Sequence, residues 1–541
     1  MAVHQSLRER LDRLDPEQRA AATARPGPIL CVAPAGSGKT STLVARIAWL
    51  VDGGADPATI TALTFNRRAA EELSDRLRGA LPAPMPAAVD AESPPLAVRV
   101  RTFHALGLEI LREAGATITP LLDREAVLRG IIPRIAPGAL RRLDTVISRF
   151  KLDLGLDPDT VASDPEAGPL ARAFVAYEQA ITAAGGLDFD DLVVRAVRLL
   201  EARPEALATW RVRCTHLLVD EAQDLDRMQL RLALLLAAPD HRIFLVGDDD
   251  QSIYGWRLAD VRRLLGLAET SLPGLRRMDL ATNYRCPGPV VERAVRLVAH
   301  NLERFAKEIR ARPHAPGTMI LAPTRSEPLE TCSTLLRSWP DDGASRAILA
   351  RTNRELLPAA VACLALDVPF RARDLDLPIE SPDLDALLAR ARGPDVAPLV
   401  VRFGRIRDTA SGAERDAASA LLHWSPAYRD LEAFCEALDD ARRRLARLRR
   451  DDAPLTLATV HGTKGLEFDH VAVIGLDAGR FPSARSIADA EDPERALEEE
   501  RRLAYVAWTR ARRTLTLSYD PEAPSRFLLE AFDPDELWPE A

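Results

Sequence analysis

The stretch Ala33-Pro34-Ala35-Gly36-Ser37-Gly38-Lys39-Thr40 decides the fold class of this chain. It follows a short apolar run, PILCVA at residues 28–33, and it opens a helical pattern near Thr40. In this setting, successive backbone N–H groups and the N-terminus of a helix cradle the phosphates of a nucleotide. Lys39 is expected to neutralise the β- and γ-phosphates, and the Thr40 hydroxyl to hold Mg²⁺. The alternative, a glycine-rich turn without a ligand, is disfavoured by the strand, the lysine and the threonine together.

Two later apolar runs end in acidic residues. HLLVDEA at residues 216–222 places Asp220 and Glu221 directly after a strand, and HRIFLVGD at residues 241–248 does the same for Asp248. Open α/β sheets bind ligands at the carboxyl ends of their strands, so Asp220 and Asp248 are expected to face one crevice. Asp220 is predicted to position Mg²⁺ and Glu221 to polarise the attacking water. An acidic pair after a strand is commonly only a solvated strand end, and it is the pairing with the phosphate loop that favours the catalytic interpretation.

The order of these patterns predicts two α/β domains, each interrupted by a helical insertion. Alternating β-branched and helical stretches indicate parallel sheets in residues 1–104 with 186–278, and again in residues 279–372 with 453–541. Residues 105–185 carry few strand signals and are expected to be a helical insertion. Residues 373–452, rich in alanine, arginine and leucine, are predicted to form a second one. The proline-rich residues 80–98 are expected to be a surface loop.

The composition is that of a multidomain globular protein, on which any nucleic-acid surface must be local. A length of 541 residues allows several separate cores, and the net charge of −8 argues against a uniformly basic coat protein. No apolar run reaches the roughly 20 residues of a membrane span, and the N-terminus lacks a signal-peptide core. We therefore expect a cytoplasmic protein. The six cysteines form no CxxC pair, so neither a disulfide framework nor a structural zinc site is predicted.

Further motifs occur in a fixed order along nearly the whole chain. They are LDPEQRAA (14–21), LTFNRRAAEEL (63–73), RTFHALG (101–107), VDEAQD (219–224), VGDDDQSIYGWR (246–257), NYRCP (283–287), TVHGTKGLEFD (459–469) and EEERRLAYVAWTRA (498–511). With the phosphate loop, this set resembles the UvrD/Rep/PcrA branch of superfamily 1A DNA helicases. The resemblance implies two RecA-like domains, ATP and Mg²⁺ as cofactors, and 3′→5′ movement along single-stranded DNA.

Carried over by position, the resemblance completes an ATP site. Gln18 would read the adenine edge, Arg46 and Tyr284 would sandwich the base, and Glu467 would contact the ribose. Gln251 would sense the γ-phosphate, while Arg285 and Arg510, both on the second α/β domain, would stabilise charge on the transferring phosphoryl group. ATP binding would then close the cleft between the domains, and hydrolysis would open it. By themselves, Arg510 in its arginine-rich helix would more often be solvated, and Tyr284 would more often be a core or rim aromatic.

The resemblance also implies a track for single-stranded DNA, which needs stacking platforms and phosphate contacts. The residues at the matching positions are Phe65, Thr102, His104, Tyr254, Trp256, Arg257 and His461. Tyr254 and Trp256 share one loop with Gln251, so base stacking and γ-phosphate sensing would be linked directly. Alternatively, Trp256 packs the seam between the domains. No residue excludes RNA as the track.

Two departures from the larger family members concern strand separation. The second insertion is reduced, and only Asp520-Pro521-Glu522-Ala523 stands between Tyr519 and Pro524, where those members carry a strand-separating pin hairpin. The basic stretch 441–450 could touch duplex phosphates, although a solvated helix face is the commoner role. We expect an ATPase stimulated by single-stranded or 3′-tailed DNA, acting in replication, repair or recombination, with weak unwinding alone.

Two other functions are open at this point. The chain could be the DNA-stimulated regulatory ATPase of a nuclease or anti-phage defence complex, with a nuclease or repair factor as its protein partner. It could also be a non-catalytic DNA-binding scaffold. The scaffold is disfavoured because Lys39, Glu221 and both arginines, Arg285 and Arg510, are present.

Overall fold

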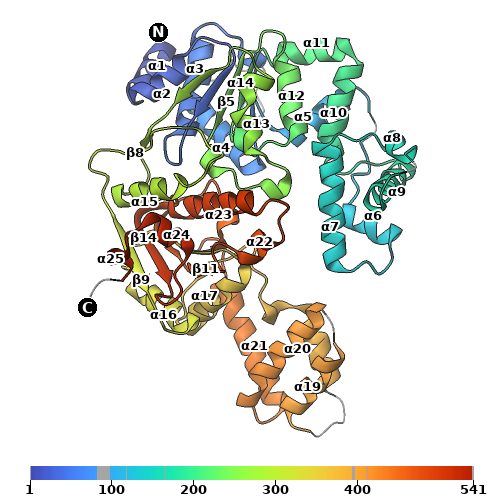
Figure 1. Cartoon of the computed structure of the whole chain (residues 1–541), viewed down its shortest axis with the longest axis vertical. Helices are drawn as coiled ribbons and strands as arrows, with labels where there is room; N and C mark the ends of the chain where they lie inside the picture. The colour runs from blue at the N-terminus through green and yellow to red at the C-terminus, as the bar shows by residue number, and fades with distance from the viewer. Residues whose placement is uncertain are drawn as a thin grey trace. The chain divides into compact units, whose positions relative to one another are not determined.

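The computed structural model describes residues 2–81, 98–116, 118–164, 166–392, 397–410 and 412–538. The chain forms two compact units (Figure 1). The first comprises Met1–Arg285 together with Asn301–Pro313, and the second comprises Cys286–His300 together with His314–Ala541. Most of the proline-rich stretch expected to be a surface loop, residues 82–97, lies outside the described residues.

The first unit is built on a six-stranded parallel sheet with the order β3-β2-β4-β5-β1-β6. The strands are β1 (Ile29–Val32), β2 (Ile60–Thr64), β3 (Arg99–Thr102), β4 (His216–Val219), β5 (Ile243–Gly247) and β6 (Arg276–Asp279). Strands β1, β2, β4 and β5 are buried along their whole length. Continuous apolar runs of this kind are typical of parallel strands that are covered on both faces.

Helices cover both faces of this sheet because successive strand residues point to opposite sides. Leu30 of β1 packs into a core with helix α12 (Arg227–Ala237), whereas Cys31 packs into a separate core with α3 (Lys39–Asp52). Figure 1 shows α3 and α12 on either side of the sheet. The other helices around the sheet are α1 (Ala2–Asp12), α2 (Pro16–Thr23), α4 (Arg67–Arg78), α5 (Phe103–Glu113), α10 (Asp191–Ala202), α11 (Pro204–Arg213), α13 (Val261–Leu265) and α14 (Leu267–Thr270).

A helical region interrupts this unit between α5 and α10. It contains α6 (Arg124–Ile131), α7 (Pro137–Ser148), a π-helical turn (Arg149–Asp153), α8 (Pro158–Ala162) and α9 (Pro169–Ala183). These helices bury their own apolar cluster, which includes Leu128, Ile147, Phe174 and Tyr177. The region therefore has a core of its own, separate from the cores of the sheet.

The second unit contains another six-stranded parallel sheet, with the order β11-β12-β10-β13-β14-β9. Its strands are β9 (Thr318–Pro323), β10 (Arg346–Ala350), β11 (Phe370–Arg371), β12 (Leu455–Thr459), β13 (Phe468–Val473) and β14 (Ala511–Tyr519). Its helices are α15 (Gly288–Val298), α16 (Pro328–Ser338), α17 (Asn353–Ala365), α22 (Ala484–Ala488), α23 (Pro493–Trp508), α24 (Arg526–Ala531) and α25 (Pro534–Leu537). The two parallel sheets confirm the predicted α/β class.

Between β11 and β12 the chain forms four helices with a small core. They are α18 (Pro382–Ala391), α19 (Leu399–Thr409), α20 (Gly412–Trp424) and α21 (Leu431–Leu448) (Figure 1). The basic stretch 441–450 belongs mainly to α21, and its arginines are engaged within the protein: Arg444 donates to the Leu364 carbonyl at 2.7 Å and Arg447 pairs with Asp367. Internal contacts of this kind favour a structural role for the stretch over contact with duplex phosphates.

The turn after β14 is short. Residues Asp520–Ala523 close it through the Ala523 N–H, which donates to the Asp520 carbonyl at 3.1 Å, and the chain enters α24 directly afterwards. Within the described residues, no strand lies between Tyr519 and Pro524. No helix in the described part of the chain is long and apolar enough to cross a membrane.

Candidate nucleotide site and nucleic-acid surface

The phosphate loop connects β1 to α3 at the carboxyl edge of the first sheet. Gly36 and Gly38 both have positive φ, 68° and 82°, a conformation that residues with a Cβ rarely adopt. A Cβ on Gly38 would lie 2.5 Å from Nε2 of Gln18, so a larger residue there would displace the end of the Gln18 side chain. The start of the loop is held by the N–H of Ala33, which donates to the carbonyl of Gly247 at 2.8 Å.

Lys39 turns back into the loop that precedes it. Its Nζ donates to the carbonyl of Ala33 at 2.8 Å and to that of Pro34 at 3.4 Å. Burial lowers the pKa of Lys39, while Glu221, Asp248 and Asp220 oppose that shift. A neutral carbonyl is a weaker partner for an ammonium group than a phosphate oxygen, so the loop suits an anionic ligand.

The acidic side chains predicted for metal and water lie at the end of β4. Burial and the neighbouring Glu221 raise the pKa of Asp220 to about 7. Glu221 itself has φ 53°, in the left-handed region that non-glycine residues rarely occupy, and such strain clusters at functional sites. Its Oε2 accepts a hydrogen bond from Nε2 of Gln223 at 2.6 Å. Glu221 is therefore held in one orientation at the sheet edge.

The donor set at this edge fits magnesium. Thr40 lies in the first turn of α3 and Asp220 directly after β4, so a hydroxyl and a carboxylate are the oxygen ligands available. Mg²⁺ is commonly held by one or two carboxylates together with substrate phosphates and water. Lys39, whose pKa responds to both Asp220 and Asp248, lies within the electrostatic reach of the acids at both strand ends.

The predicted γ-phosphate sensor is attached to the same edge. Nε2 of Gln251 donates to Asp248 Oδ2 at 2.6 Å, and the Asp248 N–H donates to Oε1 of Gln223 at 3.0 Å. Because Gln223 also holds Glu221, a continuous chain of hydrogen bonds joins Gln251 to Glu221. Sequence inspection had not singled out Gln223, although the VDEAQD motif contains it.

Gln18 and Tyr284, which are predicted to bind the adenine, both contact the phosphate loop. Nε2 of Gln18 donates to the Ser37 carbonyl at 2.8 Å. The Tyr284 N–H donates to the Gly36 carbonyl at 2.8 Å, and its hydroxyl donates to Asp15 Oδ2 at 2.7 Å. The Tyr284 ring is 39% exposed, which leaves a face for a base.

Arg285 differs from its predicted placement on the second domain. It belongs to the first compact unit, and its N–H donates to Asn283 Oδ1 at 2.9 Å. Asn283 in turn donates to the Ala35 carbonyl at 2.8 Å. A Cβ on Gly36 would lie 2.7 Å from Cβ of Arg285, so the backbone of this arginine is packed against the phosphate loop.

The prediction that Arg46 stacks on the adenine is wrong. Its side chain is 3% exposed, and Nη1 donates to the carbonyls of Ala21 at 3.2 Å and Ala24 at 3.0 Å, at the end of α2. The guanidinium lies over the ring of Phe244 on β5, 4.5 Å from its centroid. Burial lowers the pKa of Arg46 to about 10. A guanidinium enclosed between a helix end and the sheet has no face for a nucleotide base.

Three predicted residues lie in the second unit. Arg510 is buried at the end of α23, where Nε donates to the Val506 carbonyl at 2.9 Å and Nη1 to the Leu466 carbonyl at 3.1 Å. Glu467, the next residue after Leu466, pairs with Arg512. Burial and nearby cations lower the pKa of His461 to about 4, so this imidazole is neutral at physiological pH. Arg510 and Glu467 are thus brought together around one turn of chain.

Aromatic side chains form a ladder that begins in the loop of Gln251, residues 248–257, here called the sensor loop. The rings of Phe65 and Tyr254 stack with centroids 5.0 Å apart and an interplanar angle of 12°. Trp256 meets Tyr254 edge to face and is 55% exposed, and the Arg257 guanidinium lies 4.5 Å from the Trp256 ring centroid. This ladder has the alternation of rings and cations that a sequence-tolerant single-strand surface uses.

A second stack contains a residue that sequence inspection missed. His104 stacks on Phe189 with centroids 4.0 Å apart, and Phe189 is 56% exposed. Burial lowers the pKa of His104 to about 4, so it stacks as a neutral ring. Thr102 caps α5, the helix that carries His104, by accepting from the Ala105 N–H at 3.2 Å. The available signal for Phe189 was a large aromatic among acids in LDFDD (187–191).

The residues on either side of Phe189 in sequence, Asp188 and Asp190, form ion pairs. Asp188 accepts from Lys151 at 2.9 Å and from Arg124 at 2.8 Å, and Asp190 accepts from Arg124 at 2.6 Å. Although burial raises it, these cations keep the pKa of Asp188 below its ordinary value. The two carboxylates therefore anchor to the helical region while the ring between them is exposed.

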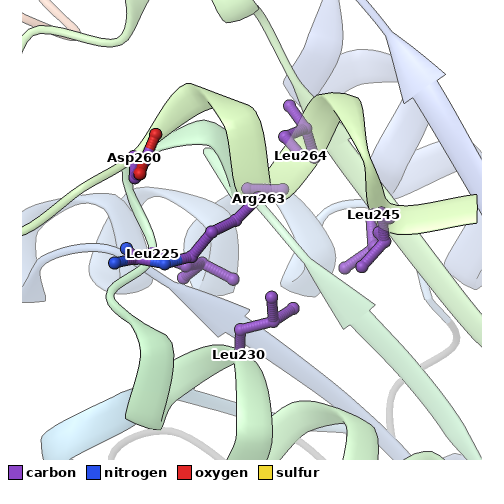
Figure 2. Close-up of a pocket in the computed structure, with 8 residues that line it drawn as sticks. Leu225, Leu230, Leu245, Asp260, Arg263 and Leu264 are labelled. Atoms are coloured by element: carbon purple, nitrogen blue, oxygen red, sulfur yellow. The ribbon is translucent and has the colours of Figure 1, made fainter. Parts of the chain in front are cut away.

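A small apolar pocket lies behind the turn that carries the acids. Figure 2 shows the side chains of Leu225, Leu230, Leu245 and Leu264 around it, with Arg263 extending along one side. At about 10 Å³ the space is far below the size of a ligand site. It is a packing gap between the acidic turn and α13 rather than a binding site.

A parallel α/β sheet with a glycine-rich loop after β1, an enclosed lysine, acids at the ends of β4 and β5 and a buried glutamine beside them defines a P-loop nucleotide hydrolase of the RecA type. The chain belongs to the UvrD/REP helicase family. Residues 14–271 match the UvrD/REP helicase N-terminal domain, and residues 426–522 match the UvrD-like helicase C-terminal domain.

Relatives that match this chain over nearly its whole length are named as DNA helicases. DNA helicase II of Escherichia coli (strain K12) is 28% identical, with 94% of this chain and 84% of that protein covered. ATP-dependent DNA helicase Rep of the same organism is 26% identical, with 97% and 95% covered. ATP-dependent DNA helicase PcrA of Leuconostoc citreum is 28% identical, with 95% and 84% covered.

Proposed function

We propose that this chain is an ATPase stimulated by single-stranded DNA, which moves 3′→5′ along the strand during replication, repair or recombination. The observation that carries the proposal is the segment 248–257, which joins Gln251 at the nucleotide site to the aromatic ladder of Tyr254 and Trp256. If DNA binding displaced this short segment, Gln251 would move with it. Conversely, if ATP hydrolysis displaced the segment, the rings of Tyr254 and Trp256 would move together with the bases stacked on them. The names of the related DNA helicases support DNA as the track.

In this proposal the nucleotide is held by the first unit. The loop Ala33–Thr40 and Lys39 bind the phosphates, Thr40 and Asp220 hold Mg²⁺, and Gln18 with Tyr284 binds the base. When bound, Mg²⁺ supplies charge neutralisation for the phosphoryl group that is transferred. Glu221, fixed by Gln223, orients and polarises the attacking water.

The second unit contributes charge stabilisation and ribose recognition. Nη1 of Arg510 donates to the carbonyl of Leu466, the residue before Glu467, so these two side chains come from neighbouring parts of that unit. His461, held neutral by burial, would contact DNA through hydrogen bonding rather than charge.

Trp256→Ala tests the aromatic ladder. We expect single-stranded DNA affinity to fall by about 1–3 kcal/mol, because stacking on one aromatic ring contributes that much per base. DNA-free ATP turnover should be unchanged, since the Trp256 ring packs on Tyr254 and Arg257 and not on the phosphate loop. Fluorescence anisotropy with a labelled oligonucleotide measures the loss. Trp424→Ala, a half-exposed tryptophan on α20, is the matched control, and equal effects of both changes would contradict the assignment.

We expect this chain to translocate along single strands much better than it unwinds a duplex. The four-residue turn Asp520–Ala523 leaves no room for a strand-separating hairpin, so we expect fast 3′→5′ movement on single strands but slow displacement of a duplex strand. Dye-labelled oligonucleotides report translocation, and 3′-tailed and 5′-tailed duplexes report unwinding in the same buffer. Fast, processive unwinding by the isolated chain would refute the weak-unwinding proposal, and movement from the 5′ end would refute the direction.

The same short turn favours a second candidate function. A chain that turns over ATP on DNA without separating strands suits the regulatory ATPase of a nuclease or defence complex, with the partner supplying the processing step. Co-purification of the tagged full chain with a nuclease or repair factor, and a nuclease activity that depends on Lys39, would support it. Full unwinding activity without any partner would favour the helicase function instead.

A further inference from the structure

Three successive aspartates of the sensor loop meet one buried lysine. Nζ of Lys307 lies 2.8 Å from Asp248 Oδ1 and 3.0 Å from Asp250 Oδ2, and it also pairs with Asp249. The carboxylates are fully buried and the lysine side chain is 1% exposed.

A short segment of chain delivers this lysine. Arg304 pairs with Asp250 through Nη2 at 2.8 Å, and the N–H of Phe305 donates to Asp249 Oδ2 at 2.8 Å. The segment Asn301–Pro313 belongs to the first unit, yet the chain on both of its sides, Cys286–His300 and His314 onward, belongs to the second. Its attachment is completed by β8 (Arg310–Ala311), which pairs with β7 (Thr282–Asn283). Asp248 is therefore held by the part of the chain that connects the units.

The lysine reaches the nucleotide machinery through one carboxylate. Asp248 places one oxygen on Lys307 at 2.8 Å and the other on Nε2 of Gln251 at 2.6 Å. Its N–H donates to Oε1 of Gln223 at 3.0 Å, and Nε2 of Gln223 donates to Glu221 at 2.6 Å. Asp248 therefore contacts Gln251 through its carboxylate, and it contacts Gln223, the partner of Glu221, through its backbone N–H.

The arrangement of the three aspartates depends on the positive charge of Lys307. Three buried carboxylates face one ammonium group and one guanidinium group, and breaking a buried ion pair leaves an uncompensated charge. Without Lys307, the aspartates would repel one another or take up protons, and Asp248 would rotate or lose its charge. Either change releases the Gln251 amide from its present orientation.

We propose that Lys307 is a positioning residue for ATP hydrolysis: it holds the Asp248 carboxylate that orients Gln251, and it ties this sensor to the segment that connects the two units. The inference rests on the proposed function. It adds a residue 56 positions beyond the sensor in sequence, which acts through Asp248 and not through the nucleotide.

Kinetics with saturating single-stranded DNA test the proposal. Lys307→Met should lower kcat by about 10²-fold, as misplaced catalytic groups do, with KM for ATP nearly unchanged. Lys307→Arg should recover most of the rate, because it restores the cation. In a Gln251→Ala background, Lys307→Met should cause little further loss, since residues that act through one another are not additive.

Controls separate positioning from stability. Arg501→Met removes a buried cation that pairs with Glu530 at 2.7 Å in the second unit, and it should lower the melting temperature without changing kcat. If Lys307→Met does not fold, Asp248→Asn, which keeps the volume, replaces it in the same cycle and should show the same dependence on Gln251. Unchanged kcat in a folded Lys307→Met variant, or full additivity with Gln251→Ala, would overturn the inference. Absence of DNA-stimulated turnover in the unaltered chain would instead overturn the proposed function.

Discussion

Glu221→Gln is expected to lower ATP turnover by about 10³-fold, because an amide cannot polarise the attacking water as a carboxylate does. The glutamine keeps the size of the side chain, so the left-handed turn and the neighbouring Asp220 should persist. ATP and single-stranded DNA should therefore still bind. Phosphate release measures turnover, and a fluorescent nucleotide analogue together with oligonucleotide anisotropy measures the two bindings.

The control for this substitution is Glu205→Gln, an exposed glutamate in the first turn of α11. It makes the same chemical change in the same unit and should leave turnover at the level of the unaltered chain. Retained hydrolysis in Glu221→Gln would refute the role proposed for Glu221. Loss of nucleotide binding along with turnover would show that Glu221 acts on the ground-state complex instead.

Arg285→Ala is expected to lower kcat by about 10³-fold, the lower end of what a phosphoryl-stabilising arginine contributes. The backbone of this residue is fixed by Asn283 and packed against Gly36. Burial is the main cause of the lowered pKa of Lys39, and the charge of Arg285 lowers it further. Removal of the guanidinium should therefore reduce charge stabilisation in the transition state while KM for ATP changes little. Steady-state ATPase kinetics with saturating DNA resolve the two constants.

Two further variants interpret that result. Arg285→Lys should recover only part of the rate, because an ammonium group lacks the planar pair of donors. Arg129→Ala, an exposed arginine on α6 that pairs with Glu125 at 2.6 Å, should have no effect. A change confined to KM in Arg285→Ala would mean that the arginine binds ATP without acting on the transferred group.

The parts of the candidate site that the sequence alone predicts lie in contiguous motifs. A phosphate loop needs glycines, a lysine and a threonine within eight residues, and Gly36 and Gly38 take the expected backbone conformation. The aromatic ladder was predictable in part for the same reason, because Tyr254 and Trp256 lie in one loop. The parallel sheets followed from strand runs that are apolar throughout.

Residues far apart in sequence were harder to place. Arg46 lies in a helix next to the phosphate loop, yet its guanidinium turns to the carbonyls at the end of α2 and to the Phe244 ring. Phe189 lies far in sequence from the residues proposed to bind single-stranded DNA, and only its stack with His104 places it beside one of them. Arg285 follows the predicted boundary at residue 278 but packs with the first unit.

By itself, the sequence predicted the chemistry of this protein from three features: a glycine-rich loop, the Asp220-Glu221 pair and the aromatic loop after Gln251, in the order found in the UvrD/REP helicase family. These features are local, because residues that are close in sequence can be directed at one ligand by the backbone conformation of a single loop. The tertiary structure alone decided which charges are enclosed and which are available. Arg46 is buried against α2, Arg285 lies beside Gly36, and Lys307 reaches Asp248 from another segment. The partners of a buried charge are set by desolvation and long-range packing, which no local pattern records.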